Sequence, residues 1–129
     1  MPSITYTYTN AGHNLMRDGT SGAASPKITY VALGTGTTAP TTGDTQLAAE
    51  VFRKRVSSYT NGTNPGEIHI DLYLAPGDAV GVVIAEVGFF GGNANGSANT
   101  GVLLCRGLYS PTHTHVNTES IQFDLDFTA

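Results

Sequence analysis

The residues of this chain whose type and spacing come nearest to a metal site are the histidines of His113-Thr114-His115. Side chains two residues apart on an extended segment project to the same side, so both imidazoles can face one ion. Two ligands do not complete a tetrahedral or octahedral shell, whereas three chains around a threefold axis would supply six nitrogens. The simpler interpretation is a surface loop with two histidines, and we therefore expect no metal ion and no cofactor.

Glu86 is the carboxylate that the sequence places in a core strand, because it interrupts the apolar run 82–90. A buried carboxylate must be paired or must raise its pKa. Arg53, Arg55 and Arg106 also lie on expected strands and are its natural partners. We expect a structural ion pair that holds the strands in register. No complementary base or nucleophile accompanies Glu86, so we do not expect an enzyme.

The other candidate motifs also favour structure over chemistry. Gly34-Thr35-Gly36 resembles the start of a phosphate-binding loop, but the rest of that motif does not follow, and we expect a turn. Asp124 and Asp126 share one face of an expected strand, as solvated residues do. Cys105, the single cysteine, lies in an apolar segment where we expect it to be a small buried residue.

Length and charge restrict the classes of partner. With 129 residues, the chain is long enough for one domain and too short for two folded cores. A hydrophobic content of 40% with a net charge of only −4 argues against disorder. The same charge balance lacks the basic surface that nucleic-acid binding requires. The longest apolar stretch, residues 79–90, is too short to span a bilayer. We expect neither a nucleic-acid nor a membrane partner.

Alternation of apolar and polar residues predicts most of the strands. They are expected over residues 4–9, 27–34, 51–59, 67–74, 80–90, 101–109 and 120–127. Residues 80–90 are more continuously apolar, which is typical of a strand covered on both faces. We expect a short helix over residues 45–51 and loops over residues 10–26 and 111–117. This pattern predicts an all-β protein: one antiparallel β-sandwich over residues 1–129, with about seven to eight strands and one short helix.

The first strand is separated from the others by the polar residues 10–26. Ile4, Tyr6 and Tyr8 form its apolar face. A strand on such a tether can reach a neighbouring subunit and add to an open sheet edge. We therefore expect residues 1–26 to serve as an extended N-terminal arm, with Ile4, Tyr6 and Tyr8 as assembly contacts.

Several segments resemble the bacteriophage tail-fibre and tail-collar proteins. In those proteins, a strand ending in Gly-x-Gly is followed by a Thr/Pro loop, an Asp-Thr-x-Leu helix and a Glu…Arg strand start. The segments that carry the resemblance are Asn14–Asp18, Lys27–Pro40, Asp44–Leu47, Glu50–Arg53, Ile84–Phe90 and Gly101–Arg106. The resemblance implies a structural protein of the virion, assembled in the cytoplasm of a bacterial host, with no enzymatic activity.

We therefore expect a tail, collar, baseplate or fibre-anchoring subunit that assembles symmetrically with its own copies and with other virion proteins. Through a fibre, such a particle could reach a glycan on the host surface. A capsid decoration protein is the alternative within virion proteins. From a different class, a carbohydrate-binding module stays open, although the chain has no tryptophan. Its candidate stacking residues are Tyr6, Tyr8, Tyr30, Tyr59, Tyr73 and Tyr109.

Overall fold

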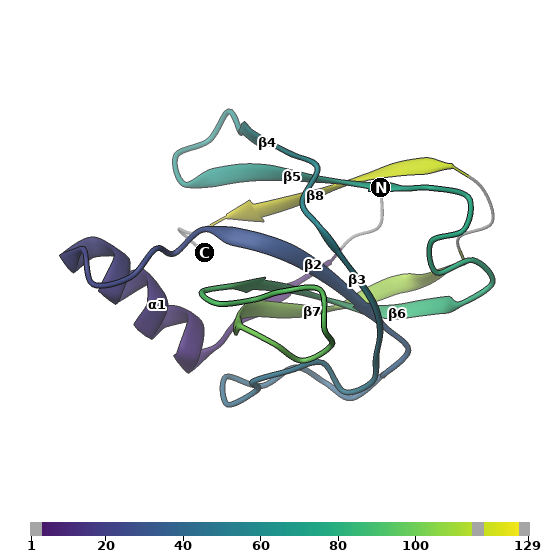
Figure 1. Cartoon of the computed structure of the whole chain (residues 1–129), viewed down its shortest axis with the longest axis horizontal. Coiled ribbons are helices and arrows are strands. Elements are labelled where there is room, and N and C mark those ends of the chain that lie inside the picture. Colours follow the sequence, from purple (N-terminus) through teal and green to yellow (C-terminus); the bar gives the residue numbers. More distant parts are fainter. Residues whose placement is uncertain (1–3, 115–117, 127–129) are drawn as a thin grey trace.

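The strands form two packed antiparallel sheets in a computed structural model that describes residues 4–114 and 118–126. In chain order, the elements are β1 (Tyr6–Tyr8), α1 (Asn10–Ser21), β2 (Ile28–Gly34), β3 (Glu50–Arg55), β4 (Ser58–Asn61), β5 (Glu67–Leu74), β6 (Val83–Gly91), β7 (Val102–Thr114) and β8 (Glu119–Asp126). One sheet has the order β1-β7-β6-β2-β3 and the other the order β4-β5-β8 (Figure 1). The predicted antiparallel β-sandwich is confirmed.

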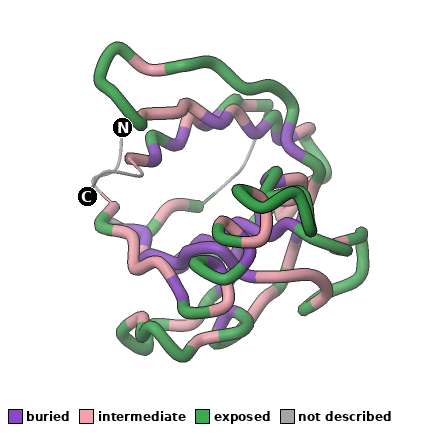
Figure 2. Tube along the Cα trace, turned by 90° about the vertical axis from the view of Figure 1, so that its left-hand side faces the viewer, coloured by how far each residue is buried: buried purple, intermediate pink, exposed green. Residues whose placement is uncertain are grey.

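The three-stranded sheet follows the alternation in the sequence. Ile70, Leu72 and Leu74 of β5 are fully buried, and the residues between them face outward. The register pairs Ile70 with Phe123 and Leu72 with Ile121, so the apolar residues of β5 and β8 form one inner face. Because side chains alternate along a strand, this face packs against the other sheet while the polar residues meet solvent. In Figure 2 the buried segments lie mainly in the strands and the exposed ones mainly in turns and loops.

Aromatic rings join the two sheets in the core. Phe89 of β6 lies edge-on to Tyr6 and to Phe123, with ring centroids 5.5 and 5.4 Å apart. Tyr109 meets Phe123 from β7, also edge-on, at 6.3 Å. Each such edge-to-face pair stabilises the fold by about 0.5–1.5 kcal/mol beyond the free energy gained by burying its apolar area. The rings therefore tie β1, β6 and β7 to the three-stranded sheet.

The central strand β6 is covered on both faces, as its apolar sequence predicts. Every residue of β6 except Val83 is buried. Its inner face meets the other sheet, and its outer face lies beneath the loops 35–49 and 92–101. Leu47 from the first loop joins Phe90 and Leu103 in a small second core there, with Ala94 from the other loop packed against it. The outer cover therefore consists of loops.

The prediction of a loop over residues 10–26 is wrong, because Asn10–Ser21 form α1. The Thr9 hydroxyl accepts a hydrogen bond from the Gly12 N–H at 2.9 Å and caps the helix start. Gly22, with φ of +82°, ends the helix in the left-handed conformation that glycine adopts freely. Leu15 is the one large side chain that the helix buries, so the sequence shows no apolar stripe.

The helix expected over residues 45–51 does not form; residues 45–49 are irregular and β3 begins at Glu50. Asp44, directly before that segment, accepts a hydrogen bond from the Thr41 N–H at 2.9 Å. The N–H groups of Ala48 and Ala49 donate to the side chain of Glu86. These backbone groups therefore bond a distant carboxylate instead of a helical turn.

The expectation of an extended arm is corrected for the described residues from Ile4 onward. β1 pairs with β7 of the same chain, with Tyr6 opposite Gly107 and Tyr8 opposite Cys105. The Tyr8 hydroxyl also donates to the Asp126 carbonyl at 3.0 Å. Only one residue separates β1 from α1, so the long tether on which the arm depended is absent.

The predicted end of the strand over residues 101–109 is also wrong, since β7 continues to Thr114. The pairing of β6 with β7 shifts between Glu86, opposite Leu108, and Ile84, opposite His113. Pro111 lies within this irregular stretch. A strand tolerates proline there because no regular ladder needs its missing N–H.

Candidate functional site

The carboxylate of Glu86 lies at the centre of a buried polar network on the outer face of the five-stranded sheet. Its Oε2 atom accepts hydrogen bonds from the N–H groups of Gly36 and Ala49, both at 2.8 Å. Its Oε1 atom accepts from the N–H of Ala48 at 3.0 Å. All three donors belong to the loop 35–49, which is thereby bound to the middle of β6.

Arg106 of β7 supplies the positive charge beside Glu86. Its Nε and Nη2 atoms lie 2.9 and 2.8 Å from Glu86 Oε1, and both side chains are almost completely buried. Nη1 donates to Asp44 at 3.1 Å, and Nη2 to the Thr38 carbonyl at 2.8 Å. The guanidinium therefore bridges the sheet to two further points of the same loop. Of the three arginines proposed as partners of Glu86, Arg106 is the one that reaches it.

Asp44 completes this network at its solvent side. Its burial acts to raise the pKa, but hydrogen bonds from the N–H and hydroxyl of Thr41, and from Arg106, outweigh that effect. The pKa of Asp44 therefore lies below its ordinary value, and the carboxylate is ionised at neutral pH. The sequence motif Asp44–Leu47 contains this residue, but nothing in its spacing indicates that Arg106 is the partner.

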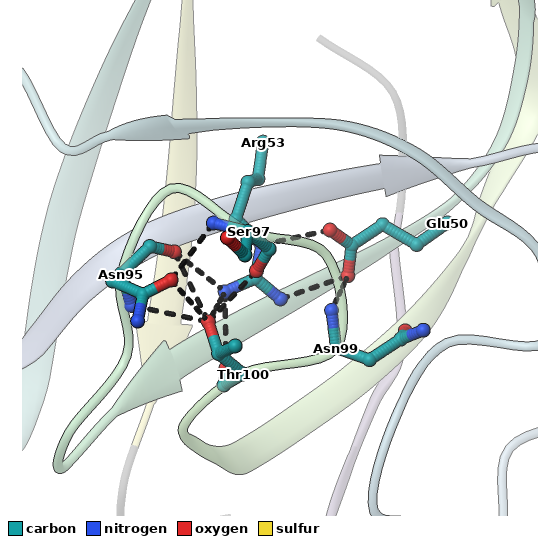
Figure 3. Close-up of polar contacts among 6 residues, drawn as sticks. All are labelled: Glu50, Arg53, Asn95, Ser97, Asn99 and Thr100. Carbon is teal, nitrogen blue, oxygen red and sulfur yellow. Dashed lines mark hydrogen bonds and ion pairs between the residues drawn. The ribbon is translucent and has the colours of Figure 1, made fainter.

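Arg53 forms a separate ion pair, with Glu50 at 2.7 Å. Its Nη1 atom donates to the carbonyls of Asn95 and Thr100 at 3.1 and 3.0 Å, as Figure 3 shows. The guanidinium also lies 4.4 Å from the centre of the Phe90 ring. Arg53 therefore holds the loop 92–101 in the way that Arg106 holds the loop 35–49.

Arg55 belongs to neither network. It is exposed and lies over the ring of Tyr30, 5.0 Å from the ring centre. Arg53 and Arg55 are two residues apart and so face the same side of β3. Arg53 reaches the carbonyls of Asn95 and Thr100, whereas Arg55, at the end of this edge strand, contacts Tyr30 instead. The structure therefore distributes the three candidate arginines over three environments.

The glycines of Gly34-Thr35-Gly36 make room for the carboxylate. A Cβ atom on Gly34 would lie 2.5 Å from Glu86 Oε2 and 2.6 Å from the Ala49 carbonyl oxygen. A Cβ on Gly36 would meet the same carboxylate oxygen. The sequence predicts a turn at this motif; its second role, the close approach of the chain to Glu86, depends on a residue 50 positions away.

The network surrounds both carboxylate oxygens of Glu86. Five nitrogen atoms lie within 3.0 Å of its two oxygens, and its side chain has no exposed surface. A general acid or base must come within hydrogen-bond reach of a substrate atom. What Glu86 and Arg106 do is hold a loop of 15 residues against the sheet.

His113 lies at the end of β7 and pairs with a carboxylate that the sequence analysis did not connect with it. Its Nε2 atom is 2.6 Å from Glu119 Oε1, and its ring stacks on Tyr109 at 5.8 Å. His115 lies outside the described residues, so the expectation that the two histidines hold no metal ion stays a prediction. Among residues 4–114 and 118–126, no three His, Cys, Asp or Glu side chains are grouped as metal ligands.

The tyrosines do not form one aromatic surface. Tyr109 is buried, and Tyr6 and Tyr8 pack against the core from β1. Tyr59 and Tyr73 are 39% and 43% exposed. Tyr59 is paired with Ile70, whereas Tyr73 alternates with the inward residues of β5, so the two rings lie on opposite faces of the sheet.

Comparisons with known proteins add no identification. No protein-family model matches the chain, and no curated protein matches it. In the part of the chain that the structure describes, no helix has the length and apolar character needed to cross a bilayer. Inferences about function therefore depend on the sequence motifs and on the geometry of the two ion-pair networks.

Proposed function

We propose that this chain is a non-enzymatic structural protein of a bacteriophage particle: a tail, collar, baseplate or fibre-anchoring subunit. One observation carries the proposal. Residues from four of the segments that resemble tail-fibre and tail-collar proteins meet in a single network. Gly36, Asp44, Glu86 and Arg106 are hydrogen-bonded or ion-paired with one another there, although they are far apart in the sequence.

The chemistry of this network supports a structural role. The charged groups of Glu50, Arg53, Glu86 and Arg106 bond within the chain, and their effect is to fix two long loops on a sheet. Ordering a loop costs about 1–2 kcal/mol per residue in backbone entropy, and buried charge-assisted hydrogen bonds are among the strong interactions that offset it. A subunit that must present a constant surface to its neighbours needs this rigidity.

The two alternatives, a capsid decoration protein and a carbohydrate-binding module, require different features of the fold. A capsid decoration protein needs the same rigid sandwich, so the network is equally compatible with a position on the shell. A carbohydrate-binding module needs aromatic rings on an accessible surface, but the two most exposed tyrosines lie on opposite faces of the three-stranded sheet. The geometry therefore favours a virion protein over a glycan-binding module.

The experiment that tests the proposal is the localisation of the chain on purified phage particles. We expect mass spectrometry to detect it in particles, and gold-labelled antibodies to mark the tail, collar or baseplate in electron micrographs. Labelling over the shell instead would establish the decoration role. Absence from particles that contain their other structural proteins would refute both, and binding to a glycan array would then favour the carbohydrate-binding module.

A further inference from the structure

Two cations that have no carboxylate partner among the described residues form a patch with two tyrosines, where β2, β3 and β4 approach one another. Lys27 lies over the ring of Tyr59, with Nζ 5.5 Å from the ring centre. Arg55 lies over the ring of Tyr30 at 5.0 Å, and its charge also acts on the Tyr59 hydroxyl. We call Lys27, Tyr30, Arg55 and Tyr59 the basic patch. Lys27, Arg55 and Tyr59 are exposed.

An apolar cavity of about 240 Å³ opens beside this patch. Its lining comes from the segment before β2 and from β2, β4 and β5. The residues are Pro26, Lys27, Ile28, Tyr59, Ile68 and Ile70. The Tyr59 hydroxyl donates to the Ile28 carbonyl and so holds the ring at the rim of the cavity. Tyr59 lines this cavity and Arg55 belongs to the adjoining patch; tyrosine and arginine are residue types enriched at the energetic centres of protein interfaces.

The charges of the molecule are unevenly distributed, and this indicates what the patch binds. Four of the six lysines and arginines, all within the described residues, form ion pairs with carboxylates of the chain; Lys27 and Arg55 do not. In contrast, β5 and β8 together carry five of the ten carboxylates and neither lysine nor arginine. On their outer face, Glu67 and Asp124 flank His69 at 3.7 and 3.5 Å.

We propose that the basic patch of one copy of this chain binds the acidic outer face of β5 and β8 on a second copy. Lys27 and Arg55 would then meet the carboxylates of Glu67, Asp71 and Asp124, and the partner would cover the apolar cavity. Charge complementarity argues for a second copy, because each molecule carries both surfaces. The inference deepens the proposed function and rests on it for its biological setting.

The geometry of this contact determines the kind of assembly. The two surfaces are different parts of the molecule, so the contact is heterologous, and each subunit keeps one free surface of each kind. Heterologous contacts generate a ring where the rotation closes and a filament where it does not. A ring of such subunits would match the symmetric surroundings of a phage tail.

The test measures the mass of the assembly in solution for the full chain and for two charge reversals. We expect the unaltered chain to form a complex larger than a dimer by light scattering. Arg55→Glu and Asp124→Lys should each raise the dissociation constant at least tenfold. A higher salt concentration should weaken the unaltered complex, since exposed charges are screened beyond about 10 Å at 0.1 M salt. Circular dichroism shows whether each variant is folded.

Mixing the two variants tests whether these two surfaces bind each other. Arg55→Glu retains its acidic face and Asp124→Lys retains its basic patch, so one unaltered contact forms between them. The two altered surfaces carry opposite charges and also attract each other, so an equimolar mixture should recover a complex larger than a dimer in which the two variants alternate. The double variant, with both charges reversed, should recover the larger complex. Arg17→Glu is the matched control, because it reverses an exposed arginine on α1 that pairs with Asp18, and it should assemble normally.

Several outcomes would overturn the inference. They are a monomeric unaltered chain, normal assembly of both single variants, and a mixture of the two variants that recovers no complex. Whether the chain is a virion protein is measured separately, by its presence in purified particles. Presence of the chain in particles with a monomer in solution would refute the interface alone. Assembly through this contact with absence from particles would refute the virion role alone.

Discussion

Replacing Glu86 by glutamine removes the charge at the centre of the loop network while the shape of the side chain stays nearly the same. The carboxylate accepts from Gly36 and Ala49 at one oxygen, and from Ala48 and Arg106 at the other. An amide has one oxygen and one NH₂ group. If its oxygen stays toward Arg106, the NH₂ group faces two backbone N–H donors, and both lose their acceptor.

The size of the effect follows from these two donors. A buried donor without an acceptor costs about 1–3 kcal/mol, so two of them cost about 2–6 kcal/mol. Arg106 keeps Asp44 and the Thr38 carbonyl, which limits the additional loss from the broken ion pair. We expect Glu86→Gln to lower the free energy of unfolding by about 4 kcal/mol. At about 2.1 cal/mol/K per residue, this corresponds to a fall in Tm of about 15 °C.

Far-UV circular dichroism during thermal and urea unfolding measures this change. The matched control is Asp18→Asn, the same carboxylate-to-amide change at the surface pair with Arg17 on α1, where we expect a change within about 0.5 kcal/mol. The m-value should stay the same, since the surface exposed by unfolding is unaltered. The expected fall in Tm is about 15 °C. A Tm of Glu86→Gln within about 2 °C of the Tm of the unaltered protein would therefore refute the inferred network.

Other substitutions test the same packing. Gly34→Ala should destabilise the protein by about 2 kcal/mol in urea unfolding, because its Cβ would overlap the Ala49 carbonyl; Gly43→Ala, with open space around it, should not, and equal losses would contradict this reasoning. The lowered pKa of Asp44 predicts a contribution to stability that is complete above about pH 3.9, the unfolded value, and is lost as the pH falls through the folded value. Asp44→Asn should lack this loss, so identical acid unfolding curves would argue against the bond to Arg106. Burial raises the pKa of the Cys105 thiol, so a thiol reagent should modify it only in the unfolded chain; rapid labelling of the native protein would contradict that burial.

The sandwich itself was predictable because the information for it is local. Strict alternation over β5 and β8 assigns each residue to one face without knowledge of the rest of the chain. The continuous apolar run of β6 in the same way indicates cover on both faces. Glu86 within that run is also a local signal, since a carboxylate in a core strand requires a partner. The fold class and the need for a buried ion pair therefore follow from the sequence alone.

Only the tertiary structure decided which residues meet. The register that places Arg106 opposite Gly88 brings its guanidinium to Glu86, while Arg53 lies against a different loop. The same long-range contacts account for the two errors in the helix assignment. α1 forms around one buried leucine after a capping threonine, whereas the amides of the residues after Asp44 bond to Glu86 instead of a helical turn. Periodicity determines which way a side chain points, but its partner depends on strand register and on loops that close over distances of tens of residues.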